Sequence, residues 1–174
     1  MWRIMELKRM NAMYDKAEAK TYTFEEILKE KGFLVYTNVG TSMMPLLRQR
    51  RDIIEIRPPK GRCKKYDAVL YKRGKKYILH RIIKVRPADY VIVGDNCISR
   101  EYGITDDMVL GVMTRVIRNG KEILPDDFWY KVYVHLWVDF YHIRVIILYL
   151  HKLVYKFGHG IKKLISMCGR EGSS

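Results

Sequence analysis

Between residues 33 and 118 the chain is a series of short β-prone runs ended by turns, and this pattern constrains the fold more than any other feature. After residues 33–39, the runs are Asp52–Arg57, Asp67–Lys72, Lys76–Val85, Tyr90–Val93 and Val109–Arg118. Turn-forming sequences such as Pro58-Pro59-Lys60-Gly61 and Arg73-Gly74 separate them. Many short strands joined by turns predict a mainly β, antiparallel domain that is barrel-like or sandwich-like.

Helical patterns flank this β region on both sides. Thr23-Phe24-Glu25-Glu26 has the spacing of a capping box and Gly32 is a helix stop, so we expect a short N-terminal helix of about two turns. Residues 128–157 contain no Gly or Pro, and their polar residues recur at steps typical of a helix. The sequence thus predicts a helical extension over 1–31, a β domain over 32–125 and a long amphipathic helical tail over 126–174.

The tail carries Asp139, His142 and Arg144 inside its apolar stretch. A transmembrane helix needs about 20 mainly apolar residues, so these interruptions argue against a membrane span. Trp129 and Trp137 beside basic residues fit a helix in a membrane interface, although a helix packed on the β domain or on a second subunit fits as well. We expect a peripheral membrane protein, attached through this tail and otherwise cytoplasmic, with the side of the membrane left open.

The chain has 33 Lys and Arg against 19 Asp and Glu, a net charge of +14, and the excess lies within residues 32–125. Such a charge attracts nucleic acid, anionic lipid or acidic partners. Because aromatic residues are not clearly interleaved with these Lys and Arg, we expect no nucleic-acid partner. The cysteines, Cys63, Cys97 and Cys168, are odd in number and widely spaced, which argues against a disulfide framework and a zinc site.

Ser42 is the serine best placed for nucleophilic chemistry. It follows a β-prone run, in the turn Gly40-Thr41-Ser42-Met43-Met44-Pro45, where successive backbone N–H groups can point at a developing oxyanion. A serine hydroxyl attacks only when a base takes its proton. A serine in a turn more often only forms hydrogen bonds with the neighbouring backbone, so this motif alone does not identify Ser42 as a nucleophile.

His80 is the matching candidate base. It lies in the run Lys76–Val85, where alternation places it on the same face as Ile78 and Ile82, a buried or cleft-lining face. With an ordinary pKa of about 6.5, an imidazole is largely neutral at pH 7 and can accept a proton. The alternative is a structural histidine in the core, whose ring is hydrogen-bonded within the protein.

A third candidate lies in the turn Gly94-Asp95-Asn96, which follows the run Tyr90–Val93. Asp95 could orient an imidazole, as the acid of a catalytic triad does. Such a turn also commonly caps its own backbone.

Five motifs in order resemble the signal peptidase and LexA-like serine peptidase superfamily, across residues 31–120. They are Gly40-Thr41-Ser42-Met43-Met44-Pro45, Tyr66-Asp67-Ala68-Val69-Leu70, Leu79-His80-Arg81-Ile82, Gly94-Asp95-Asn96 and Leu110-Gly111-Val112. A histidine before Arg81, where many members have lysine, makes the chain more similar to the archaeal and endoplasmic-reticulum type. The resemblance implies that Ser42 is the nucleophile and His80 the general base.

The same resemblance assigns the acid to Asp95, with Glu101 as a further candidate, and the oxyanion hole to the main-chain N–H groups of Thr41, Ser42 and Met43. It implies an endopeptidase that cleaves leader or signal-like peptides with small residues next to the cleaved bond, without a metal or organic cofactor.

Two alternatives remain open at this point. The first is a binding protein that kept the fold and lost catalysis, and that holds anionic lipid or nucleic acid through its basic middle region. The second is a LexA-like self-cleaving regulator. Residues 1–31 are too short and too nearly neutral for the helix-turn-helix module that such a regulator would need.

Overall fold

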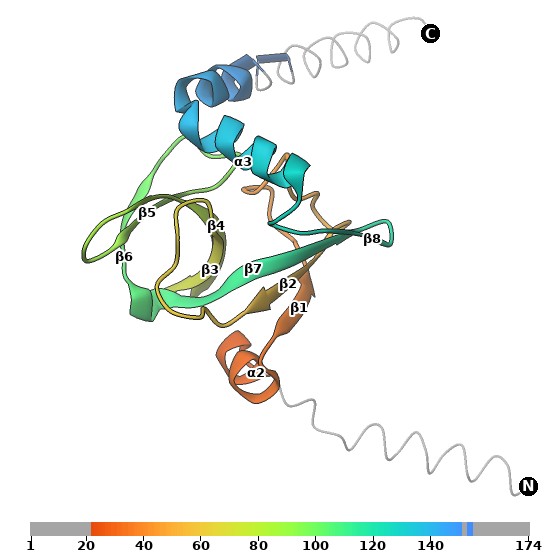
Figure 1. Cartoon of the computed structure of the whole chain (residues 1–174), viewed down its shortest axis with the longest axis vertical. Helices are drawn as coiled ribbons and strands as arrows, with labels where there is room; N and C mark the ends of the chain where they lie inside the picture. Colours follow the sequence, from red (N-terminus) through yellow and green to blue (C-terminus); the bar gives the residue numbers. More distant parts are fainter. Residues whose placement is uncertain (1–21, 151–152, 155–174) are drawn as a thin grey trace, which may run out of the picture.

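The computed structural model describes residues 22–150 and 153–154, which form one antiparallel sheet with flanking helices (Figure 1). The strands are β1 (Leu34–Thr37), β2 (Ile53–Arg57), β3 (Ala68–Arg73), β4 (Lys76–Val85), β5 (Tyr90–Val93), β6 (Glu101–Ile104), β7 (Val109–Arg118) and β8 (Lys121–Ile123). The helices are α2 (Phe24–Lys31), the short 3-10 helix η1 (Asp106–Met108) and α3 (Phe128–Asp139). The prediction of a mainly β, antiparallel fold is therefore confirmed.

The sheet is open, in the order β1-β2-β7-β3-β4-β5-β6, with β8 paired to β7. Register shifts at Glu55/Ile56, Leu70/Tyr71, Ile82/Lys84 and Tyr90/Ile92 interrupt four of its ladders. Such bulges increase the local twist of a strand, and Figure 1 shows the sheet strongly curled. The curl lets side chains from distant strands meet inside the sheet.

Gly111 permits the close pairing of β7 with β2. A Cβ at this position would lie 2.5 Å from the Ile56 side chain and 2.8 Å from the Arg57 carbonyl oxygen. Any larger residue would push the two strands apart, so glycine is required at this point of their pairing.

Both flanking helices pack on the core of the sheet. Leu28 of α2 and Tyr130, Val134 and Val138 of α3 belong to the same buried cluster as Ile54 and other strand residues. The capping box at Thr23 is formed and Gly32 ends α2 in the left-handed conformation, as the sequence predicted. Figure 1 shows α3 above the curled sheet and α2 below it.

The prediction of one unbroken helix over 128–157 is wrong. α3 ends at Asp139, Phe140 takes a non-helical conformation, and a second helix covers residues 141–150. Tertiary contacts explain the break, because Lys65 and Tyr66 hold the Asp139 carboxylate while the Arg144 side chain reaches the carbonyl of Cys97. Residues 151–152 and 155–157 of the predicted helix lie outside the described residues.

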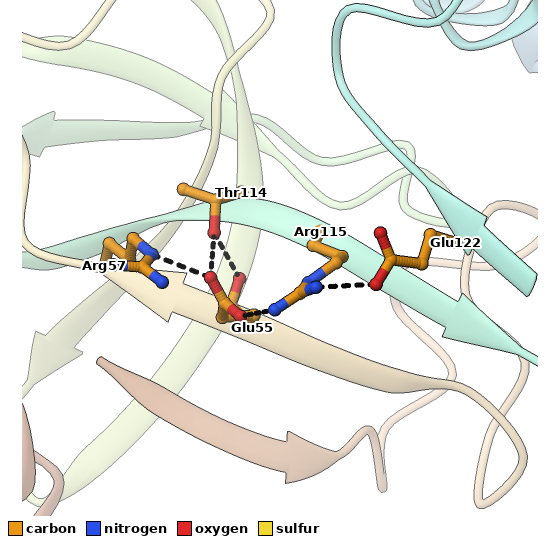
Figure 2. Close-up of polar contacts among 5 residues, drawn as sticks. All are labelled: Glu55, Arg57, Thr114, Arg115 and Glu122. Atoms are coloured by element: carbon orange, nitrogen blue, oxygen red, sulfur yellow. Dashed lines mark hydrogen bonds and ion pairs between the residues drawn. The ribbon is translucent and has the colours of Figure 1, made fainter. Parts of the chain in front are cut away.

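An ion-pair network fastens β2 to β7 and β8 (Figure 2). The buried Glu55 carboxylate accepts hydrogen bonds from Arg57 Nε at 2.7 Å, from the Thr114 hydroxyl at 3.1 Å and from Arg115. Arg115 also donates to Glu122 at 2.6 Å. Burial opposes the charge, but the bonds from Arg115 and Arg57 prevail and lower the pKa of Glu55 to about 2. Part of the basic excess therefore serves to hold the sheet together.

Candidate active site

His80 lies on β4 and is held by a carboxylate two strands away. Its side chain is nearly buried, and Nδ1 lies 2.8 Å from Glu101 Oε1 at the start of β6. The other carboxylate oxygen of Glu101 accepts a hydrogen bond from Arg73 at 3.0 Å. The Tyr71 hydroxyl of β3 lies 3.3 Å from Nδ1. These contacts fix both the position and the rotation of the imidazole.

The bond to Glu101 determines which ring nitrogen of His80 is free. A neutral imidazole that donates from Nδ1 to a carboxylate carries no proton on Nε2. Burial lowers the pKa of His80 below its ordinary value, although the Glu101 carboxylate works in the opposite direction. At neutral pH the ring is therefore uncharged, with Nε2 available to accept a proton.

Gly94 marks the point where His80 and the Ser42 turn converge. A Cβ at residue 94 would lie 2.9 Å from His80 Nε2, 2.8 Å from the Ser42 carbonyl oxygen and 2.8 Å from Cys97 Sγ. The Ser42 carbonyl also accepts a hydrogen bond from the Asn96 N–H at 2.7 Å. The structure thus brings the main chain of Ser42 and the imidazole of His80 to the same point beside Gly94.

The Ser42 hydroxyl makes no hydrogen bond within residues 22–150 and 153–154, and so none to His80. Across the same described part of the chain, the N–H groups of Thr41, Ser42 and Met43 donate no hydrogen bond. The hydroxyl and the three expected oxyanion donors therefore have no hydrogen-bond partner in the described part of the chain.

Asp95, which we expected to orient His80, is engaged elsewhere. Its carboxylate is fully buried and receives two hydrogen bonds from Arg81, at 2.9 Å from Nε and 2.7 Å from Nη2. The physical reason is strand alternation: Arg81 follows His80 on β4 and so projects from the opposite face. The assignment of Asp95 as the residue that contacts His80 is corrected to Glu101.

Asp95 instead belongs to a loop that the C-terminal helices hold in place. Trp137 donates to the Asp95 carbonyl at 2.8 Å and Tyr133 to its carboxylate at 3.0 Å. The helix after α3 adds bonds from Tyr141 to the Ile98 carbonyl at 2.7 Å and from Arg144 to the Cys97 carbonyl at 3.0 Å. We call residues 94–98 the glycine loop; it contacts Ser42 and His80 on one side and both helices on the other.

A mostly apolar pocket of about 470 Å³ opens beside Ser42. Its walls come from α2, β1, β3, β4 and the serine turn: Phe24, Tyr36, Asn38, Val39, Gly40, Ser42, Leu70, Tyr77, Ile78 and Leu79. The pocket is large enough for an apolar side chain to enter next to the serine hydroxyl.

Sequence reasoning missed Tyr71 and Arg73 as neighbours of the site. Both lie in or next to a predicted strand, but only the pairing of β3 with β4 places them beside His80 and Glu101.

Among the described residues, no group of three or more His, Cys, Asp or Glu side chains could hold a metal ion. Nor does any helix in the described part have the length and apolar character to cross a membrane.

Comparison of the chain with protein families, with curated proteins and with solved structures found no match.

Proposed function

We propose that this protein is a serine endopeptidase of the signal peptidase type, with Ser42 as nucleophile, His80 as general base and Glu101 as the residue that orients the base. The observation that carries the proposal is the position of His80 Nε2, which approaches the same point beside Gly94 as the Ser42 carbonyl oxygen. Glu101 on Nδ1 leaves Nε2 as the proton acceptor.

The reaction follows from these positions. His80 Nε2 takes the Ser42 proton as Oγ attacks the carbonyl carbon of the peptide bond, and the N–H groups of residues 41–43 stabilise the oxyanion. The tetrahedral intermediate breaks its C–N bond, and the leaving amine takes the proton from His80. Water then hydrolyses the ester on Ser42, with His80 again accepting and returning a proton. A rotation of the Ser42 side chain or a shift of its turn must bring Oγ to Nε2 when substrate binds.

The proposed substrate is a leader or signal-like peptide with small residues next to the cleaved bond, as the resemblance implies. The apolar pocket beside Ser42 supports an extended peptide that places an apolar side chain there. Strand β1, which carries Tyr36 of this pocket, has only β2 as a neighbour among the described strands, and its other edge is the proposed place for such a peptide to pair.

The direct test is cleavage of an Ala-x-Ala leader peptide by the full chain. Ser42→Ala and His80→Ala should each abolish cleavage while circular dichroism stays unchanged. Ser99→Ala is the matched control, because Ser99 is an exposed serine outside the site, and this variant should cleave as the wild type does. Cleavage by the Ser42→Ala variant would refute the proposed mechanism.

A serine-directed fluorophosphonate separates the proposed enzyme from its rivals. Labelling at Ser42 that disappears in His80→Ala supports the peptidase. Steeply salt-dependent ligand binding without labelling would instead identify a binding protein that has lost catalysis. Cleavage of the protein's own chain, with no turnover of added peptide, would identify a self-cleaving regulator.

A further inference from the structure

α3 is apolar on two opposite faces. The inner face packs on the sheet through Tyr130, Val134, Trp137 and Val138, which are all buried. On the outer side the apolar residues Phe128, Trp129, Val132 and Leu136 are exposed, with Trp129 at 77% and Phe128 at 70%. A surface helix normally places polar residues on the face opposite its core stripe. This helix therefore has a second apolar face with no partner among the described residues.

The 141–150 helix also has an exposed apolar face. It contacts the protein through a narrow stripe that includes the buried Arg144 and Leu148. Ile143, Ile146, Ile147 and Leu150 have the i, i+3, i+4, i+7 spacing of one helix face, and all four are exposed. Residues 140–150 contain no Asp, Glu or Lys. The exposed face is thus a continuous apolar stripe.

We define the docking face by its exposed apolar residues on the two helices. They are Phe128, Trp129, Val132, Leu136, Phe140, Ile143, Ile146, Ile147, Tyr149, Leu150, Leu153 and Val154. Scattered exposed apolar side chains are normal, but twelve of them on two consecutive helices indicate an interaction surface.

Basic side chains gather where the two helices meet the sheet. A pocket of about 380 Å³ at the junction of the two helices is lined by Lys65, Lys84, Arg86 and Arg100, beside Val138 and Tyr141. Lys65 pairs with Asp139 and Arg86 with Asp89. In the described part of the chain Lys84 and Arg100 form no ion pair, and Arg100 lies over the Tyr141 ring at 4.2 Å. The pocket therefore has positive charge available for an anion.

We propose that the docking face binds the surface of an anionic lipid bilayer, with the apolar stripe in the acyl-chain boundary and the basic pocket at the headgroups. Trp129, Phe128 and Tyr149 are aromatic residues of the kind that membrane interfaces favour. A second copy of the chain fits less well, because a symmetric contact here would bring two basic pockets toward each other. The proposal does not depend on the peptidase activity.

The test is flotation of the full chain with lipid vesicles, either phosphatidylcholine alone or phosphatidylcholine with added phosphatidylserine. The wild type should float with the vesicles that contain phosphatidylserine. Trp129→Ser and Ile146→Ser should each lower the partition coefficient by about tenfold or more, because each removes a side chain from the lipid. Val35→Ser is the matched control, since Val35 is 48% exposed on β1, and its partition should equal that of the wild type.

Charge and self-association are separated by two further measurements. Lys84→Ala and Arg100→Ala should each weaken binding to the anionic vesicles by about fivefold and leave binding to neutral vesicles unchanged. Equal binding of the wild type to both vesicle types would overturn the role of the basic pocket. Absence of flotation, or a lipid-free dimer that Ile146→Ser dissociates without any flotation of the wild type, would overturn the docking itself. Ser42→Ala should float as the wild type does, whatever its peptidase activity.

Discussion

Glu101 and His80 meet across β5, with Oε1 and Nδ1 separated by 2.8 Å although their strands, β6 and β4, are not neighbours in the sheet. The contact uses the curl of the sheet and the absence of a side chain at Gly94, which leaves the other ring nitrogen uncovered. When an imidazole fixed in this way is neutral, Nε2 is the ring nitrogen that can accept a proton.

Replacing Glu101 with Gln should lower kcat about 10- to 100-fold, because the imidazole loses its orientation and the charge that stabilises its protonated form. Since Glu101 raises the pKa of His80 against the effect of burial, the acid limb of the kcat/KM profile should also move to lower pH. The measurement is kcat/KM against pH. The Glu122→Gln variant, altered in an exposed acid of the network in Figure 2, should keep the wild-type profile. An unchanged profile in Glu101→Gln would contradict the assigned role.

His80 should make the stability of the protein depend on pH. Its pKa in the folded state is lower than the ordinary value of 6.5, so the unfolded chain binds the proton more readily. Stability from this group is complete above pH 6.5 and is lost as the pH falls through the folded-state pKa. We expect the free energy of unfolding, measured in urea, to fall more between pH 7.5 and pH 5 for the wild type than for His80→Gln. Equal losses would show that His80 is not buried in its neutral form.

Replacing Gly94 with Ala should damage both the fold and the site. The added Cβ would lie under 3 Å from His80 Nε2 and from the Ser42 carbonyl oxygen, so one of the two segments must move. Overpacking of this kind costs about 1–3 kcal/mol of unfolding free energy. The rate of peptide cleavage should fall as well, because His80 or the Ser42 turn is moved out of position. Gly40→Ala is the stability control, because the nearest atom to its added Cβ is 3.9 Å away. Equal stability of the two variants would contradict the close approach at Gly94.

Replacing Asp95 with Ala should lower the free energy of unfolding. It should not have the effect on catalysis that the loss of a catalytic acid would have. The change leaves the fully buried Arg81 guanidinium without its carboxylate, which costs about 3–5 kcal/mol. Chemical denaturation measures the effect, with Asp126→Ala as the control because that side chain is 96% exposed. Glu101→Gln should show the reverse pattern, with little loss of stability and a large loss of activity.

Local signals predicted helix α2 and six of the eight strands of this fold, but not β6 or β8. The capping box at Thr23 and the stop at Gly32 are formed, and each predicted strand run corresponds to an observed strand. The break at Phe140 was not predictable, because no Gly or Pro signals it and contacts of Asp139 and Arg144 with distant segments cause it.

The candidate site was predictable in part. Ser42 and His80 could be identified as candidates from a turn and a strand, each from its own neighbours in the sequence. The choice between Asp95 and Glu101 could not be made in this way. It depends on which face of β4 each acid meets, and that is fixed by the pairing of β4, β5 and β6 rather than by any local pattern.

The glycine loop is bonded to Ser42 on one side and to both C-terminal helices on the other. Any displacement of those helices must therefore either break the bonds to Asp95, Cys97 and Ile98 or carry the loop with it. The hydrogen bonds therefore form one path from the two helices, through the carbonyl groups of the glycine loop, to the main-chain carbonyl of Ser42. The proposed docking face and the proposed nucleophile are thus connected through a single loop.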